Sequence, residues 1–347
     1  MADTSLYQTH SPALMALHGD LENFARGQGA LPTGTSGSVL ERSNAGGFRY
    51  YAHQSYDALG KKIERYLAGP VGDAAADAKA REMRDRVQAL SSAVKSIRLL
   101  IREGFKFVDS KSYATLAALR NHSLFQAGAL LVGSHAYGAL LNQLGVRAAQ
   151  YATQDVDIAR NAELAFGGGA PASFLEMLES SGIAFFGVPG LDRRQPASSF
   201  KETGKSFFQV DLLVPSPDEA IDLVPVPELK AHATALPYLR YLLAQSQDAL
   251  VLAREGCCSV RVPLPERFAL HKLMVSQLRK RGAKALQDVA QAAVLFAVLA
   301  ERHAGALEEA AAAVPASARK HLAKGVPALR DALAAHPRAA EVLRTIA

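Results

Sequence analysis

The sequence predicts an α+β protein with an α/β-like core, set between an N-terminal region of hairpin and helices and a helical C-terminal domain. Strand-like and helix-like patterns alternate through the middle of the chain, from about residue 128 to residue 214. A long amphipathic helical pattern comes before this region, and from Pro265 onward every periodic pattern is helical. With 347 residues, of which 49% are hydrophobic and 21% charged, the chain can bury a sizeable core.

The first 47 residues are expected to form a loose segment, because their second half is rich in Gly, Ser, Thr and Pro. Residues 48–120 are expected to form a β-hairpin followed by helices. Two aromatic-rich runs flank a turn at Gly60, and basic residues are interleaved with the aromatic ones. Such a hairpin can bind nucleic acid by stacking and phosphate contact. The alternative is that its rings simply pack on the next helix.

Hydrophobic residues at helical spacing predict a long helix over 75–103, ended by Gly104, and a second helix over 111–121. A core domain is expected over 121–264 and a helical domain over 265–347. The expected strands are 128–133, 153–159, 183–188, 206–214, 249–254 and 258–262. The expected helices are 135–144, 171–181, 266–281, 283–303 and Ala-rich helices broken by Pro315, Pro327 and Pro337.

Several features favour a cytoplasmic protein with no membrane partner. The most apolar run starts at Val289 and is bounded by Asp288 and Glu301. This run is shorter than the roughly 18–20 residues that a membrane helix needs. The N-terminus lacks the basic start and apolar run of a signal peptide. The adjacent Cys257 and Cys258 show no zinc-ligand spacing. The formal net charge of +6 suits a polyanionic partner without naming one.

The stretch "TQDVDIA" carries the first candidate site residues. Asp155 and Asp157 alternate with Val156 and Ile158, so both carboxylates lie on one face of the expected strand. Two such carboxylates repel each other and are costly to desolvate unless a cation lies between them. Mg²⁺, with Mn²⁺ as the alternative, suits this position because it prefers hard oxygen ligands and shares them with substrate phosphates.

A D-x-D pair alone is weak evidence, because roughly one is expected by chance in a chain of this length. A third acid strengthens the interpretation. In "SFFQVDLLV", Asp211 lies on the face opposite Val210 and Leu212. If the two strands are neighbours, three carboxylates converge and could hold two metal ions about 3.5–4 Å apart.

Gly133 and Ser134 supply the complementary half of such a site. Glycine lets the backbone approach a phosphate, Ser134 can donate a hydroxyl hydrogen bond, and the following helix offers free N–H groups. His135 and Tyr137 lie in the first turn of that helix and could contact the phosphates. This combination predicts a metal–triphosphate site.

The order Gly133-Ser134, Asp155-Val156-Asp157, Asp211 resembles the nucleotidyltransferase superfamily with the DNA polymerase β-like fold, over about residues 120–215. It is similar to bacterial minimal nucleotidyltransferases and to nucleotidyltransferase-like toxins. The resemblance implies a polymerase β-like mixed sheet and metal-dependent transfer of a nucleoside monophosphate from an NTP to a hydroxyl acceptor, with release of pyrophosphate. It implies that the three acids are metal ligands, that Asp211 can also take the acceptor's proton, and that Ser134 binds the β and γ phosphates.

In this chain 20 residues separate Ser134 from Asp155, which is a longer spacing than in many members. The segment 139–152, which includes Arg147, is therefore expected to be elaborated, and the resemblance does not identify the acceptor. Further on, "PERFALHKLMVSQLRKRGAKALQDVAQA" resembles the helical pair that follows the catalytic domain in these groups. Basic residues, and no acid, lie between Arg267 and Gln287: Lys272, Arg279, Lys280, Arg281 and Lys284. Lys272 first and Lys284 second are expected to bind the nucleotide. Alternatively these residues form a solvated face, with Lys284 paired to Asp288 at i, i+4.

The acceptor is expected to be an RNA such as tRNA, or a protein, ahead of a small molecule. The toxin branches also raise a toxin role and an antitoxin-type protein partner. Two other functions fit parts of the pattern. One is a non-catalytic nucleotide- or RNA-binding module that keeps the fold, against which the complete set of three acids argues. The other is a metal-dependent nuclease, which would give Gly133-Ser134 no role.

Overall fold

The structure is a computed structural model that describes residues 5–149, 153–167, 171–188, 197–279 and 282–346. Its strands are β1 (Tyr7–Thr9), β2 (Ser38–Ser43), β3 (Arg49–Tyr56), β4 (Lys62–Ala68), β5 (Ala129–Val132), β6 (Val146–Ala148), β7 (Asp155–Arg160), β8 (Phe185–Gly187), β9 (Ser199–Glu202), β10 (Gln209–Pro215), β11 (Asp222–Val226), β12 (Ala231–Leu236), β13 (Ser246–Ala253) and β14 (Gly256–Pro263). Its helices are α1 (Pro12–Gly27), α2 (Ala74–Arg102), α3 (Ser110–Asn121), α4 (Gly133–Gln143), α5 (Phe174–Glu179), α6 (Leu239–Leu243), α7 (Pro265–Ser276), α8 (Ala283–Arg302), α9 (Ala306–Ala312), α10 (Ala316–Ala332) and α11 (Pro337–Ile346), with a 3₁₀ turn at Pro227–Leu229.

A mixed seven-stranded sheet forms the centre of the molecule. Its main path runs β11-β12-β10-β7-β5, and β9 and β8 extend it beside β10. Strand β10 is parallel to both β7 and β12, whereas β5 is antiparallel to β7 and β11 is antiparallel to β12. The fold is therefore α+β with a mixed sheet, as the sequence predicted.

Strands β7 and β10 alternate between fully buried apolar residues and half-buried polar ones. Val156 and Ile158 on β7, and Val210 and Leu212 on β10, are almost completely inaccessible to solvent and join the main hydrophobic core. Their burial holds the two strands in one register, because a slip by one residue would turn these side chains to the other face.

The C-terminal helices pack on one another and on the sheet, so a single hydrophobic core runs through both regions. Helix α7 begins with Pro265 in its first turn, where a proline costs no hydrogen bond. By length and composition helix α8 is apolar enough to cross a membrane, but most of its apolar stretch is buried inside the protein. This burial agrees with its expected role as a core helix.

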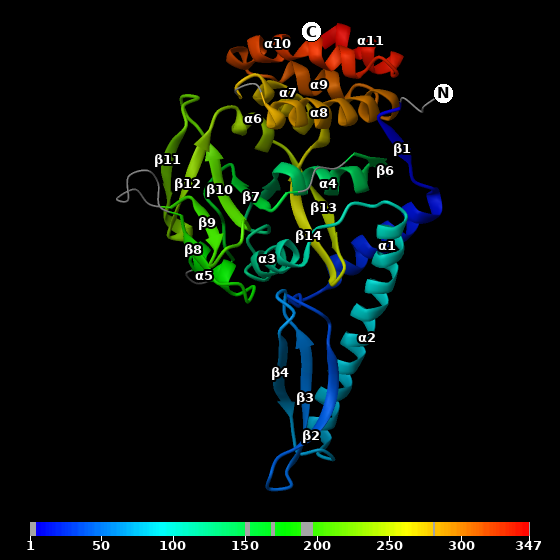
Figure 1. Ribbon diagram of the computed structural model, residues 1–347, viewed down its shortest axis with the longest axis vertical. Coiled ribbons are helices and arrows are strands. Elements are labelled where there is room, and N and C mark those ends of the chain that lie inside the picture. Colours follow the sequence, from blue (N-terminus) through cyan, green and yellow to red (C-terminus); the bar gives the residue numbers. More distant parts are fainter. Residues whose placement is uncertain (1–4, 150–152, 168–170, 189–196, 280–281, 347) are drawn as a thin grey trace.

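Strands β2, β3 and β4 form a separate three-stranded sheet that, with α2, projects from the body of the protein as an arm (Figure 1). The hairpin expected around Gly60 is β3–β4, and Gly60 has a positive φ of 79°. Helix α2 begins after Asp73, whose carboxylate accepts hydrogen bonds from the N–H groups of Ala75 and Ala76.

The segment 1–47, expected to be loose, contains the regular elements β1, α1 and β2 in its described part, whereas residues 28–37 form neither helix nor strand. Ser11 caps α1 with Pro12 in the first turn, and β2 pairs along its length with β3. Its many Gly, Ser, Thr and Pro residues are therefore compatible with order, because caps and turns use the same residue types.

Three strands of the central sheet were not expected: β9, β11 and β12. Strand β9 is short and lies in the polar stretch 191–208, of which 191–196 lie outside the described residues. Strand β11 contains Pro225, which is tolerated because β11 is at the edge of the sheet. In the segment 139–152, α4 ends and β6 pairs with β1, while residues 150–152 are not described.

Candidate functional site

The strands that carry the three predicted carboxylates, β7 and β10, are direct neighbours in the sheet, which is the condition for these carboxylates to converge. They pair in parallel with Asp211 opposite Asp157, and with Gln209 opposite Asp155. In a parallel pair, side chains of paired residues lie on the same face of the sheet. Asp157 and Asp211 therefore lie side by side, with Asp155 two residues earlier on β7.

Gly133 brings the start of α4 against the same carboxylates. Val132, which precedes it on β5, pairs with Asp157 on β7. Gly133 has a positive φ of 68°, and a Cβ added to it would lie 1.9 Å from Oδ2 of Asp157. Only glycine fits here, since any side chain would collide with the carboxylate.

The first turn of α4 has unused hydrogen-bond donors. No side chain caps its N-terminus, where Val132 is the capping residue. Because the first N–H groups of a helix have no partner within it, this end can bind an anion. Ser134 lines the cavity in front of these groups.

A cavity of about 620 Å³ lies between strands β7 and β10 on one side and helices α7 and α8 on the other. One half of its lining is charged or polar: Gly133, Ser134, Thr153, Gln154, Asp155, Asp157, Asp211, His271, Lys272, Arg279, Lys284, Gln287 and Asp288. The other half is apolar: Val132, Phe207, Leu213, Ile221, Leu236, Pro237, Leu239, Leu242, Phe268, Val275 and Leu278. The structure thus brings together seven of the eight predicted site residues, all except His135.

The carboxylates on β7 are held in an environment that disfavours their charge. Burial, and then the negative charge of Asp211, raises the pKa of Asp157 to about 7. The same two causes raise the pKa of Asp155, and Lys284 opposes the shift. Among the described residues, no ion pair joins a cation to Asp155, Asp157 or Asp211.

Asp211 is held by neighbouring polar side chains. Its Oδ1 accepts hydrogen bonds from the Ser199 hydroxyl on β9 and from Nε2 of Gln209, the latter at 2.8 Å. These bonds fix the carboxylate beside Asp157 without neutralising it.

The three carboxylates are chemically suited to a hard divalent cation, because they offer only oxygen ligands and carry uncompensated charge. Within the described residues, however, no three His, Cys, Asp or Glu side chains are arranged as a ready metal-binding group. The oxygen donors are therefore of the right chemical kind for a metal ion. To bind one, the three carboxylates would have to move closer together than they are in this structure.

Across the cavity, basic residues on α7 and in the turn after it form ion pairs with an acid on α8. Nζ of Lys272 and Nε of Arg279 each lie 2.7 Å from a carboxylate oxygen of Asp288, whose side chain is 5% exposed. Asp288 therefore pairs with these two residues and not with Lys284, which is exposed at the cavity wall. The helix expected over 266–281 ends at Ser276, so Arg279 lies beyond it, and the two residues share Asp288 as a partner without lying on one helical face.

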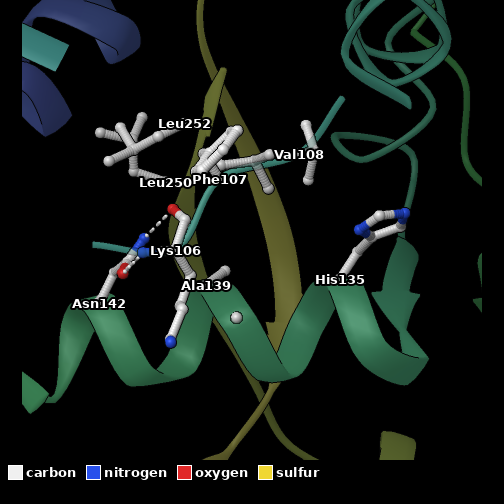
Figure 2. A pocket seen from close by; sticks show the side chains of 10 residues that line it. Lys106, Phe107, Val108, His135, Ala139, Asn142, Leu250 and Leu252 are labelled. Carbon is white, nitrogen blue, oxygen red and sulfur yellow. Dashed lines mark hydrogen bonds between the residues drawn. The ribbon is translucent and has the colours of Figure 1, made fainter. Parts of the chain in front are cut away.

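His135 does not lie with the other predicted residues. Its side chain is 5% exposed and lines a small void beside α4 (Figure 2). Its Nε2 lies 3.3 Å from the Ser112 hydroxyl. Burial lowers its pKa to about 4, so the ring is neutral. The face of α4 that carries His135 and Asn142 packs toward β13, which turns this histidine away from Ser134.

The apolar half of the cavity and His271 were missed from the sequence. His271 is part of the lining, and burial lowers its pKa to about 3. Its only sequence signal was its position beside Lys272. Residues such as Leu236 and Leu239 lie on elements near β10 whose placement no local pattern indicates.

These features define the class of protein as an α+β protein with a cavity, lined by acidic and basic side chains, beside the interior strands β7 and β10 of its sheet. A family model described as nucleotidyltransferase matches residues 110–315, which cover α3 through α9 and include every residue of the charged half of the cavity. The chain belongs to this nucleotidyltransferase family. No curated protein and no solved structure matches it.

Proposed function

We propose that this protein transfers a nucleoside monophosphate from an NTP to a hydroxyl acceptor, with release of pyrophosphate. One observation carries the proposal: the unpaired carboxylates of β7 and β10 lie beside the uncapped start of α4, in a cavity large enough for a nucleotide. Carboxylates for a metal and backbone N–H groups for phosphate are the two parts that such a reaction requires.

Asp155, Asp157 and Asp211 would hold Mg²⁺ or Mn²⁺. When bound, the metal supplies Lewis-acid stabilisation of the charge that develops on the phosphates. The uncompensated charge of these carboxylates, and the raised pKa of Asp157, support this role because a cation would remove the cause of the shift.

The remaining cavity residues would bind and orient the triphosphate. The N–H groups at Gly133 and the hydroxyl of Ser134 would donate hydrogen bonds to the β and γ phosphates. Lys272, held in place by Asp288, and the exposed Lys284 would offset their negative charge.

In the transfer, the acceptor oxygen would form a bond to the α-phosphorus while the bond from that phosphorus to pyrophosphate breaks. Asp211 would accept the acceptor's proton. Gln209 and Ser199 donate hydrogen bonds to one oxygen of this carboxylate, which leaves the other for the acceptor. The proposed acceptors are an RNA such as tRNA, or a protein, with a small molecule third. A cytoplasmic location, a toxin role and an antitoxin-type partner remain parts of this hypothesis.

A second candidate is a non-catalytic module that binds nucleotide or RNA. It is favoured by the arrangement of the carboxylates, which among the described residues do not form a ready metal-binding group. In that case the NTP would bind without turnover.

The test is incubation of the full chain with each α-³²P-NTP, Mg²⁺ or Mn²⁺, and either cellular RNA or protein. We expect label on one class of macromolecule, and its loss in the Asp155→Ala/Asp157→Ala variant. Leu286→Ser is a matched control, because this exposed α8 residue does not line the cavity. NTP binding with no label on any acceptor would favour the binding module.

A further inference from the structure

The mouth of the cavity exposes large apolar side chains. Phe207 and Ile221 are 77% and 72% exposed, which makes them two of the three most exposed large hydrophobic residues in the described part of the chain. Both line the cavity, as does Leu278, which is 42% exposed. We call Phe207, Ile221 and Leu278 the apolar rim. Such clustering beside a polar site is typical of a surface that binds a partner.

The apolar rim is continuous with the apolar half of the cavity. Leu213, Leu236, Leu239 and Val275 line the same cavity behind it. A molecule that reaches the carboxylates past the rim therefore meets aliphatic side chains as well as charged ones. Aliphatic surface binds apolar side chains of a polypeptide, whereas nucleotides are usually held by aromatic stacking and cations.

The loop around Ile221 is strongly acidic. Asp218, Glu219 and Asp222 flank Ile221, and in the described chain none of them forms an ion pair. The N–H of Ala220 and the hydroxyl of Ser216 hold the pKa of Asp218 below its usual range. Glu219 is held by hydrogen bonds from the hydroxyls of Ser317 and Tyr238, which leaves Asp218 and Asp222 to repel a phosphate backbone and attract a basic segment.

We propose that the acceptor hydroxyl belongs to a polypeptide segment whose apolar side chains bind the apolar rim and whose basic residues face Asp218 and Asp222. The proposal rests on the proposed nucleotidyl transfer and specifies the acceptor of that same site. Among the three rim residues only Phe207 is aromatic, and Nζ of Lys201 lies 5.4 Å from the centre of its ring, so less of that ring is free for base stacking, which favours a polypeptide over RNA.

The chemical step balances with the NTP as the only co-substrate. The hydroxyl oxygen of Ser, Thr or Tyr in the segment forms a bond to the α-phosphorus, and the bond from that phosphorus to pyrophosphate breaks. The hydroxyl proton passes to a cavity carboxylate and then to water. The products are the nucleotidylated polypeptide and pyrophosphate.

The test compares three fluorescent probes by anisotropy, using the full chain with Mg²⁺ and a non-hydrolysable NTP analogue. The probes are a short peptide of Leu, Lys and one Ser, the same peptide with Glu in place of Lys, and an oligouridylate. We expect the basic peptide to bind at least about tenfold more tightly than the acidic one. Equal binding of the two peptides, or tightest binding of the oligouridylate, would overturn the proposal.

Variants link this preference to the named residues. Phe207→Ser/Ile221→Ser should weaken binding of the basic peptide about tenfold, because both side chains are exposed and available for contact. Asp222→Lys should reduce the preference for the basic peptide several-fold. Leu286→Ser, equally exposed at 73% but outside the cavity lining, should change neither. A loss as large in Leu286→Ser as in the rim variant would contradict a specific rim.

Failure of this proposal can be told apart from failure of the proposed function. Equilibrium dialysis with α-³²P-NTP and Mg²⁺ measures nucleotide binding without any acceptor. If the NTP does not bind, the proposed function is wrong. If it binds and label passes to RNA but not to the Ser peptide, only the polypeptide acceptor is wrong.

Discussion

The cavity contains a buried acid, Asp288, and a half-buried one, Asp157, in two different electrostatic situations. On α8, Asp288 is paired at 2.7 Å with both Lys272 and Arg279. On β7, Asp157 has no ion pair among the described residues and borders Asp211, so that its pKa rises to about 7. The protein neutralises the first acid itself, whereas the described residues supply no ion-pair partner for the second.

The difference follows from what surrounds each carboxylate. Asp288 faces Lys272 on α7 and Arg279 in the turn that follows this helix, and both long basic side chains reach it. Asp157 faces Gly133, where no side chain fits, and a strand that carries another acid. A buried acid with partners stabilises the fold or positions a neighbour, whereas one without partners costs stability and is retained for function.

The largest expected effect is on activity, for Asp157→Ala. We expect nucleotidyl transfer to fall by at least about 10²-fold, because a charge-stabilising group at the reacting phosphates is lost. Stability should stay equal or rise, since an uncompensated buried charge disappears. Label transfer and urea denaturation measure the two effects. Full activity in this variant would remove Asp157 from the site.

The contrasting substitution is Asp288→Ala, which should lower the free energy of unfolding by about 3 kcal/mol, because it leaves the mostly buried Lys272 without its partner. Arg279→Ala is the matched control. Arg279 is 44% exposed, so its loss should cost about 1 kcal/mol or less. If Asp288→Ala were as stable as the wild type, the two groups of acids would not differ as described.

The pH dependence of stability should show the same contrast more weakly. The folded-state pKa of Asp157 is raised to about 7, so the folded form holds a proton that the unfolded form has lost. Without metal, this group should lower stability progressively as the pH rises from about 4 to about 7. We expect a Tm a few degrees lower at neutral than at mildly acidic pH, measured by calorimetry.

Asp157→Asn is the control for this prediction, since other groups also titrate in the range. The variant should lose the part of the pH dependence that Asp157 contributes, and Mg²⁺ should reduce it in the wild type. An unchanged profile in Asp157→Asn would show that the carboxylate is not protonated near neutral pH.

The smallest expected effect is for Lys284→Ala. This exposed lysine acts on Asp155 and Asp157 only through space. We expect KM for the NTP to rise about two- to fivefold, with kcat and stability nearly unchanged, and the effect to shrink at high salt. Steady-state kinetics at two salt concentrations would measure it. A large loss of kcat would instead give Lys284 a role in the transition state.

Sequence patterns were most informative where local geometry decides the outcome. The two-residue period of a strand placed Asp155 and Asp157 on one face, and the helical period defined α2, α3 and α8 closely. They were least informative for β9 and β11, which are short or contain a proline, and for residues 1–47, whose composition is shared by loops and by capped helices.

The sequence by itself determined the glycine at the start of α4, the shared face of the β7 acids and the apolar stripes that form the core. Only the tertiary structure decided that Asp211 lies opposite Asp157, that Asp288 pairs with α7, that His135 turns away and that an apolar rim borders the cavity. The first group depends on backbone periods within one element. The second depends on which elements pack together, and side chains distant in the chain determine that packing.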